Sequence, residues 1–336
     1  MTDVFVIGGG PAGLAAAIAA RKQGLSVVVA DGNRPPIDKP CGEGLMPDCR
    51  ASARRIGIEI PDEAGYRFRG IRFHGAGRSV EADFSEGHGL GVRRLALHRL
   101  MVDAAERAGV EMRWGVSIGG LEEIEARWIV GADGGASLVR KWAGLDRFVR
   151  NTRRYAYRRH YAIAPWTDSM EVYWGEDCQI YVTPVGSGEV CLALISKDKA
   201  LRLEEALERY FPALHARVRG VDATSTERGA ITSMMRLRSV VRGKVALIGD
   251  ASGSVDAITG EGLCLSFKQA ALLAEGMARF DLSEYARVHP RLALRPTMMA
   301  RAMMLLDQGP RARKWGIGAL SAAPWIFEKL LEVHVG

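Results

Sequence analysis

The hydrophobic pattern at the start of the chain predicts a β-α-β unit. Residues 4–7 form an apolar run that leads directly into a glycine-rich turn, and the small side chains of residues 12–23 predict a helix. A second apolar run over residues 26–30 ends at Asp31. Two apolar strands separated by a helix are typical of a parallel sheet.

The same alternation returns later in the chain and extends this sheet. A helix is predicted over residues 95–108, and a strand over residues 110–114 follows it. Further apolar strands are predicted over residues 128–132 and 244–248, and the second of them leads to a helix that starts near Glu261. This pattern predicts an α/β fold with a doubly wound parallel sheet.

Two stretches break the alternation and are typical of antiparallel β-structure. Residues 68–84 hold short β-like runs between glycine turns, and residues 155–196 form a predicted meander. The C-terminal part is helical, and Pro290 and Pro296 are expected to kink or divide its first helix. The runs of the meander cover residues 155–163, 170–174, 179–183 and 189–195, and the helical stretches cover residues 284–307 and 314–333.

Gly8, Gly10 and Gly13 stand in the spacing G-x-G-x-x-G between the first strand and the first helix. Gly8 permits the tight turn, Gly10 lets a pyrophosphate approach the backbone, and Gly13 lets the helix pack close to the strand. Asp31 lies 18 residues beyond Gly13, where a carboxylate accepts hydrogen bonds from a ribose. With the N-terminus of the helix facing the phosphates, this context predicts a Rossmann-type dinucleotide site.

Two further turns of glycine and aspartate follow strands later in the chain. Residues 131–140 resemble the D-G motif of flavoprotein hydroxylases, and residues 246–253 resemble their G-D motif. Residues 256–263 look like the stretch that borders the flavin ring in the same proteins. The chain is similar to the superfamily of p-hydroxybenzoate hydroxylase and geranylgeranyl reductase, and this resemblance implies a single Rossmann-type domain that binds FAD.

The resemblance also implies which residues hold the cofactor. Asp250 is expected to accept a hydrogen bond from the ribityl chain, and Arg94, with Arg93 as the alternative, is expected to lie along FAD. Asp133 and Arg140 either touch the cofactor or cap a turn and a helix. The residues expected at the cofactor are Gly8, Gly10, Pro11, Ala12, Gly13, Asp31, Gly32, Cys41, Gly42, Arg94, Asp133, Gly134, Arg140, Gly249, Asp250, Gly260, Glu261, Gly262 and Leu263.

A discontinuous domain organisation follows from the same resemblance and from the breaks in the pattern. The FAD-binding domain is expected to comprise three segments, and a substrate-binding antiparallel sheet two, followed by a C-terminal helical segment. The three segments are residues 1–65, 90–150 and 242–282, the substrate-binding sheet takes residues 66–89 and 151–241, and the helical segment takes residues 283–336.

Composition and charge limit the other function classes. The chain has 336 residues, a net charge of +7 and five scattered cysteines without a C-x-x-C pair, which predicts free thiols in a reducing compartment and no metal site. No apolar run is long enough to span a bilayer, and the first strand begins at once, so we expect a cytoplasmic protein.

Basic residues are concentrated in two places. Eight of them lie between Arg140 and Arg159 with a single acid, Asp146, and they form either a solvated face or a site for an anionic partner such as NADPH, an acidic substrate or an anionic lipid surface. No nucleic-acid-binding module accompanies them. Residues 311–320 are basic and then apolar, which is typical either of packing on the protein's own domain or of peripheral contact with a membrane.

Cys41 and Tyr181 are the candidate catalytic residues. Residues 40–45 (Pro-Cys-Gly-Glu-Gly-Leu) resemble the cysteine-glycine element of geranylgeranyl reductases, which implies a thiol that donates a proton while hydride goes to an alkene. The alternative is a small side chain among glycines that the backbone requires. Tyr181 opens the sequence Tyr-Val-Thr-Pro, where those reductases carry Y-x-W-x-F-P, so both bulky aromatics are missing. Tyr181, His160 and Tyr173 either face a substrate or are ordinary sheet residues.

Three functions fit these residues. The favoured one is hydroxylation of a hydrophobic aromatic or polyketide-like molecule by an FAD-dependent monooxygenase, with NAD(P)H as reductant. The second is flavin-dependent reduction of isoprenoid double bonds, which the departure around Tyr181 makes less favoured. The third is a non-catalytic escort protein on the same fold, against which the three intact nucleotide motifs argue.

Overall fold

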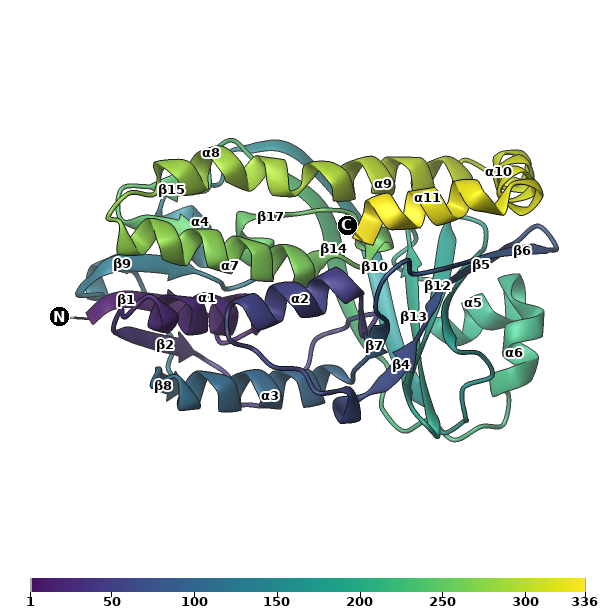
Figure 1. Cartoon of the computed structure of the whole chain (residues 1–336), viewed down its shortest axis with the longest axis horizontal. Coiled ribbons are helices and arrows are strands. Elements are labelled where there is room, and N and C mark those ends of the chain that lie inside the picture. Colours follow the sequence, from purple (N-terminus) through teal and green to yellow (C-terminus); the bar gives the residue numbers. More distant parts are fainter. Residues whose placement is uncertain (1, 336) are drawn as a thin grey trace.

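The structure is a computed structural model that describes residues 2–335, with the side chain of residue 151 left out of the description. A six-stranded and an eight-stranded sheet lie end to end, and helices α8 (Ser283–Leu292) and α9 (Leu294–Leu306) run along one side of both (Figure 1). The predicted fold class, a parallel Rossmann-type sheet with an antiparallel sheet and C-terminal helices, is confirmed.

The six-stranded sheet has the order β15-β16-β9-β1-β2-β8, and every neighbouring pair except β15 with β16 is parallel. Its inner strands β16, β9, β1 and β2 are mostly buried and apolar, as expected for a parallel sheet covered on both faces, whereas the edge strands are partly exposed. Helix α1 (Pro11–Lys22) contacts both α3 (Arg94–Arg107) and α7 (Gly262–Ala278). The strands are β1 (Thr2–Ile7), β2 (Val27–Asp31), β8 (Glu111–Trp114), β9 (Ala126–Gly131), β15 (Val241–Arg242) and β16 (Val245–Leu247).

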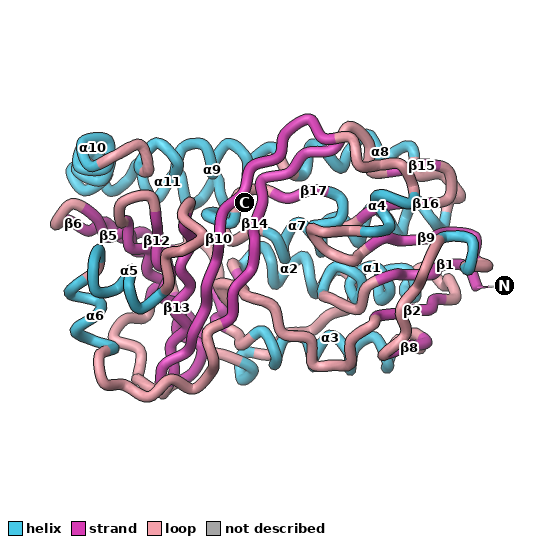
Figure 2. Tube along the Cα trace, turned by 180° about the vertical axis from the view of Figure 1, so that it is seen from behind, coloured by secondary structure: helices cyan, strands magenta, loops and turns pink. Residues whose placement is uncertain are grey.

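The eight-stranded sheet has the order β17-β14-β10-β13-β12-β11-β5-β6, and all neighbours are antiparallel except β11 with β5. Figure 2 shows β10 and β14 side by side as two long strands that reach from this sheet towards α8. All four predicted strands are present, and β11, β12 and β13 form the predicted meander, but β10 pairs with β13 instead of with β11. The strands are β5 (Gly70–Gly75), β6 (Arg78–Asp83), β10 (Phe148–Tyr161), β11 (Ser169–Trp174), β12 (Cys178–Gly186), β13 (Glu189–Ser196), β14 (Arg228–Leu237) and β17 (Gly253–Ser254).

Sequence analysis did not predict strand β14. Its first four residues, 228–231, are exposed, so the period-two alternation that marks a half-buried strand is missing there. Pairing with β10 over residues 148–158 holds it in the sheet instead. The proposed domain boundaries stay a prediction.

Smaller elements connect the two sheets. A three-stranded sheet of β3 (Gly44–Leu45), β7 (Gly89–Gly91) and β4 (Tyr66–Phe68) contacts β12. Helices α5 (Leu203–Tyr210) and α6 (Pro212–Val218) cover the outer face of the eight-stranded sheet. The remaining elements are α2 (Pro47–Arg55), α4 (Leu138–Trp142) and the 3-10 turns η1 (Asp62–Ala64), η2 (Leu121–Glu123), η3 (Gly249–Ser252) and η4 (Ala257–Thr259).

The C-terminal helices cover the other face of the eight-stranded sheet. They are α9, α10 (Pro310–Ala322) and α11 (Pro324–Val335), and their buried residues share a core with β5, β11 and β12. The predicted division of the first helical stretch falls at Ala293, between α8 and α9, while Pro296 is tolerated in the first turn of α9. Over residues 2–335, no helix has both the length and the apolar character that crossing a bilayer requires.

Candidate functional site

The glycine turn after β1 has the shape that its spacing predicts. Gly8 has a φ of +112°, and a Cβ on it would lie 2.4 Å from the carbonyl oxygen of Ala132. A Cβ on Gly13 would lie 1.9 Å from the carbonyl oxygen of Gly8, so α1 meets the strand only if residue 13 is glycine. Gly10 differs, because a Cβ there meets no atom within 4 Å. The backbone beside Gly10, at the start of α1, is therefore open to a phosphate.

Asp31 ends β2 and holds the same turn. Its Oδ2 accepts a hydrogen bond of 2.7 Å from the Gly9 amide, and its Oδ1 accepts one of 2.8 Å from the Asn33 amide. An ionised carboxylate has about four lone-pair sites, so Asp31 can still accept from a ribose hydroxyl. His98 also contacts this turn, with its Nε2 2.9 Å from the Gly9 carbonyl oxygen. Sequence analysis did not predict this contact. Burial lowers the pKa of His98, so this imidazole stays neutral.

The D-G motif is tied into the backbone rather than left open. Asp133 Oδ2 accepts from the amides of Leu138 and Val139, at 2.6 and 3.1 Å, and so caps α4. The buried Arg140 donates to the carbonyl of Gly135 at 2.7 Å and to that of Ala251 at 3.1 Å. Arg140 thereby joins the D-G turn to the G-D turn. The structure shows the capping and linking contacts of both residues, and their contact with the cofactor stays a prediction.

The G-D motif lies on η3 at the end of β16, against the glycine turn. A Cβ on Gly249 would lie 2.5 Å from Cβ of Ala12 in α1. The next residue, Asp250, makes no hydrogen bond through its side chain with residues 2–335, and its carboxylate is exposed. The surrounding protein raises the pKa of Asp250, and the nearby charges of Lys39 and Arg94 oppose the rise. A carboxylate without a partner in the described chain is free to accept a hydroxyl hydrogen.

The stretch after η4 leaves backbone open beside these turns. Gly260, with a φ of +68°, and Gly262 would each carry a Cβ that meets no atom within 4 Å. Glu261 lies between them, and its Oε1 is 2.9 Å from Nδ1 of His334 in α11. Leu263 is half-buried in the first turn of α7. The C-terminal end of the described chain thus lies beside the stretch that resembles the flavin border.

Arg94 and Arg93, the two alternatives for the cofactor arginine, lie in different surroundings. Arg93 forms an ion pair of 2.7 Å with Glu189 on β13. Arg94 is buried, its Nε has no hydrogen-bond partner among the described residues, and the acids whose charges act on it include Asp250 and Asp38. A buried guanidinium edge without a partner favours Arg94 as the residue that a cofactor would satisfy.

The loop of residues 41–43 lies against three neighbouring strands of the eight-stranded sheet. Thr183 on β12, Cys191 on β13 and His160 on β10 form one cross-strand row, because Cys191 pairs with both of the others. The Thr183 hydroxyl donates to the Gly42 carbonyl at 2.6 Å, and the Cys191 thiol lies 3.9 Å from the Cys41 carbonyl oxygen. His160 contacts Glu43. Each member of the row therefore contacts a different residue of the loop.

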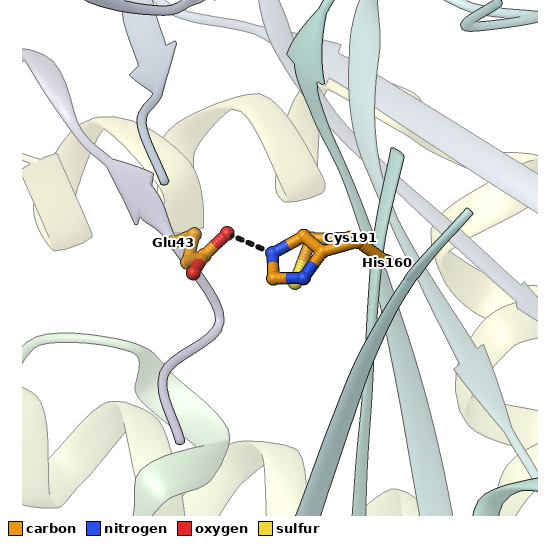
Figure 3. A group of neighbouring side chains, drawn as sticks. All are labelled: Glu43, His160 and Cys191. Carbon is orange, nitrogen blue, oxygen red and sulfur yellow. Dashed lines mark hydrogen bonds and ion pairs between the residues drawn. The ribbon is translucent and has the colours of Figure 1, made fainter. Parts of the chain in front are cut away.

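Glu43 is the buried centre of these contacts, and sequence analysis did not single it out. Figure 3 shows its carboxylate directed at His160, with Cys191 beside them. Glu43 Oε2 lies 2.6 Å from His160 Nε2, and Oε1 accepts from Arg158 at 2.6 Å and from the Arg94 amide at 2.8 Å. Burial alone would raise the pKa of Glu43, but His160 and Arg158 hold it below its usual value.

Among the described side chains, two groups bring metal-ligand atoms within 4.8 Å of one another. One is Glu43, His160 and Cys191, and the other is Glu204, Glu208 and His215. In the first group, the Arg158 guanidinium already occupies the carboxylate, and a cation would have to share that space. The second group contains two exposed glutamates. We therefore assign a metal to neither.

The two other candidate sheet residues are engaged within the protein. Tyr181 is buried, and its hydroxyl donates to the Ile258 carbonyl in η4 at 2.5 Å. Burial raises the pKa of Tyr181 far above its usual value, so the phenol stays protonated. The Tyr173 hydroxyl donates to Glu171 at 2.8 Å. Tyr181 therefore positions the stretch that precedes Gly260.

The chain offers FAD the groups that the cofactor needs. Open backbone at Gly10 would receive the pyrophosphate, Asp31 the adenosine ribose and Asp250 the ribityl hydroxyls. Open backbone at residues 260 and 262 and the unpartnered edge of Arg94 would receive the flavin ring. All of these groups lie at the carboxyl ends of parallel strands or beside them, where open α/β sheets bind ligands. The residues present fit the cofactor.

Comparisons with known proteins agree with this fit. The model of a family described as FAD binding domain matches residues 1–282. Menaquinone reductase of Mycobacterium tuberculosis is 28% identical over 349 residues, covering 92% of this chain and 85% of that protein. Digeranylgeranylglycerophospholipid reductase of Thermoplasma volcanium is 28% identical over 298 residues, covering 78% of this chain and 74% of that protein.

The fold is shared with solved flavoproteins as well. The crystal structure of p-nitrophenol 4-monooxygenase from Pseudomonas putida superposes with a TM-score of 0.83 at 20% identity, covering 100% of this chain and 98% of that one. At this identity the likeness shows the fold alone. The family match covers all three nucleotide motifs, so the chain belongs to the FAD binding domain family and is an FAD-dependent oxidoreductase.

Proposed function

We propose that the protein reduces a carbon–carbon double bond in the isoprenoid chain of a lipid. The observation that supports this most is that two reductases, one named for menaquinone and one for a digeranylgeranyl lipid, match over most of the chain. Sequence analysis favoured oxygenation, but the monooxygenase likeness above is one of fold. The aromatic residues missing around Tyr181 argue against reduction, but the two reductase matches outweigh them in the choice between reduction and oxygenation.

The proposed reaction adds two electrons and two protons across the double bond. FAD, when bound and reduced, supplies a hydride, and NAD(P)H is the proposed source of its electrons. The chain must supply the remaining proton to the other carbon. Cys41 is half-buried, and burial raises the pKa of its thiol, while Arg94 opposes the rise. Cys41 therefore carries a proton at neutral pH and is the proposed donor.

The other groups bind and orient. Arg94 and Asp250 would hold the cofactor, and Tyr181 would keep the stretch before Gly260 in place. Residues 66–89 and 151–241 are the proposed substrate-binding part, because the inner face of their sheet carries the contacts to the Cys41 loop.

The test is the mass of the product. Purified protein, NADPH and menaquinone are incubated under argon and in air, and the lipid is analysed by mass spectrometry. We expect a gain of two hydrogens in both atmospheres. A gain of one oxygen that appears only in air would overturn the proposal in favour of hydroxylation.

We also propose that the C-terminal helices rest on an anionic membrane surface, from which such a lipid would enter. On α9 the exposed side chains Leu294, Met298 and Leu305 share one face with Arg295 and Arg301. Trp315 on α10 and Trp325 on α11 are 80% and 65% exposed. Exposed tryptophans beside arginines are typical of helices that lie in a membrane interface.

Vesicle binding checks this surface. Substituting both Trp315 and Trp325 with serine is expected to lower binding to phosphatidylglycerol vesicles by at least about tenfold, because two large apolar side chains no longer enter the interface. The control is Phe280→Ser, which removes an aromatic that is 61% exposed and lies after α7. Equal cosedimentation of the wild type and the double variant would count against the surface, as would binding that salt leaves unchanged.

A further inference from the structure

The loop that carries Cys41 has a backbone conformation that its sequence does not favour. Glu43 has a φ of +60°, in the left-handed region, although it is not glycine. Its side chain is fully buried, and both of its carboxylate oxygens are bonded. A non-glycine residue keeps such a conformation only where its surroundings hold it. At Glu43 the surroundings are Arg158 and His160 on β10 and the first amide of α3.

Glu43 also contacts the side chain of Cys41 within this loop. The Glu43 amide donates to Cys41 Sγ at 3.4 Å, which directs the sulfur back towards the glutamate. His160 in turn is fixed from its far side, because Nδ1 lies 2.7 Å from the Ser225 hydroxyl. The contacts of Arg158 and His160 with Glu43 therefore also help to fix the position of the Cys41 thiol.

Glu43 also changes the charge around Cys41. The charged groups that face the thiol are Arg94 from α3, Arg158 from β10 and Glu43 from its own loop, and the neutral thiol of Cys191 approaches from β13. The two guanidinium groups favour a thiolate at Cys41, and the Glu43 carboxylate disfavours it. Arg158 also forms an ion pair with Asp38, in which a guanidinium nitrogen lies 2.9 Å from the carboxylate, and this pair partly offsets its charge.

We propose that Glu43 is a positioning residue for Cys41: its buried carboxylate fixes the loop that carries the thiol and offsets the cations of Arg94 and Arg158 beside it. The use of the Cys41 proton in lipid reduction rests on the proposed function. The charge and position of the thiol do not depend on it.

The experiment measures how fast iodoacetamide alkylates Cys41 between pH 6 and 10 in the purified flavoprotein, with the modified peptide identified by mass spectrometry. Cys41 is the one cysteine among the described residues that is not buried, so its peptide reports the loop. In Glu43→Gln, which keeps the shape and removes the charge, we expect the midpoint of the pH profile to fall and the rate at pH 7 to rise about tenfold.

Two variants serve as controls. Glu171→Gln removes another buried glutamate that contacts a histidine, His74 at 3.2 Å, but lies on β11 and not at the thiol. Its alkylation profile should match the wild type. Glu43→Asp keeps the negative charge and should return the midpoint close to that of the wild type. A packing role alone would give the reverse order, because glutamine keeps the size of glutamate and aspartate does not.

An unchanged or raised midpoint in Glu43→Gln overturns the proposal, and so does alkylation of Cys191 at the same rate as Cys41, since the loop would then have left the sheet. If Glu43→Gln does not fold, Arg94→Met tests the same balance with the opposite sign. Removal of that cation should slow alkylation at pH 8, and an unaltered rate would contradict the inference. Failure of lipid reduction with these alkylation results intact would overturn only the proposed function.

Discussion

Arg158→Met is expected to lower the free energy of unfolding by about 3–5 kcal/mol, because it leaves a buried carboxylate without its main cation. Arg158 is 2% exposed and bonds Glu43 at 2.6 Å and Asp38 at 2.9 Å. Methionine matches much of its volume, so the loss reports the charge rather than a cavity. Urea denaturation at pH 7, with the slope compared between variants, measures the effect.

The neighbouring arginine provides a matched control. Arg159 lies on the other side of β10, and its ion pairs with Glu204 and Glu227 are long, at 3.7 and 3.8 Å, and partly exposed. Arg159→Met should cost no more than about 1 kcal/mol. Equal losses in the two variants would show that the cluster around Glu43 does not carry the expected stability.

The pH dependence of the same variant has a defined sign. Because the pKa of Glu43 lies below its usual value, the ion pair stabilises the folded state at neutral pH and is lost as the pH falls through that lowered pKa. The difference between the wild type and Arg158→Met should therefore shrink on acidification. A difference that stays constant down to acid pH would assign the stability to packing.

Asp250→Ala is expected to weaken FAD binding about ten- to 100-fold, the value of a charge-assisted hydrogen bond of roughly 1.5–3 kcal/mol. Its carboxylate has no partner within the described chain, and the charges of Lys39 and Arg94 act on it, so removal also leaves two cations less balanced. The flavin content of the purified protein from its visible absorption, and titration of the stripped protein with FAD, give the change.

Cys41→Ala is the control for flavin retention. It removes a thiol near the same cofactor but none of the groups expected to bear the ribityl chain, so it should lose much less flavin than Asp250→Ala. Asp250→Asn keeps an acceptor oxygen without the charge, so its flavin content should lie between those of the wild type and Asp250→Ala. Equal flavin in Asp250→Ala and Cys41→Ala would remove Asp250 from the cofactor site.

The nucleotide turns were predictable because their chemistry is local. Gly8, Gly13 and Gly249 are required by contacts within a few ångströms of the backbone, and such requirements leave a fixed spacing in the sequence. The strand–turn–helix order placed them at one edge of the parallel sheet. Strand β14 was not predicted for the opposite reason. It is part of the sheet because it pairs with β10, and its own residues do not alternate between apolar and polar side chains at its start.

The cluster around Glu43 was not predictable, because its members are distant in sequence. His160 and Glu43 are 117 positions apart, and Arg158 and Glu43 are 115 apart. The run of basic residues was interpreted as a solvated face or an anion site. In the structure, Arg154 and Arg158 are instead buried and paired with acids of the same chain. The one signal was their spacing, since residues 154, 158 and 160 share a face of a strand.

The alternation along β10 determines how this strand tolerates changes of length. Arg154, Arg158 and His160 are buried, whereas Arg153 is exposed and Arg159 is partly exposed on the opposite side. Deleting one residue within the strand would carry every following side chain to the opposite face, so that His160 would leave Glu43 and Tyr161 would take its place. Point changes at residue 153 should be harmless. Gains or losses of residues are tolerable only outside β10, for instance in the hairpin between β12 and β13.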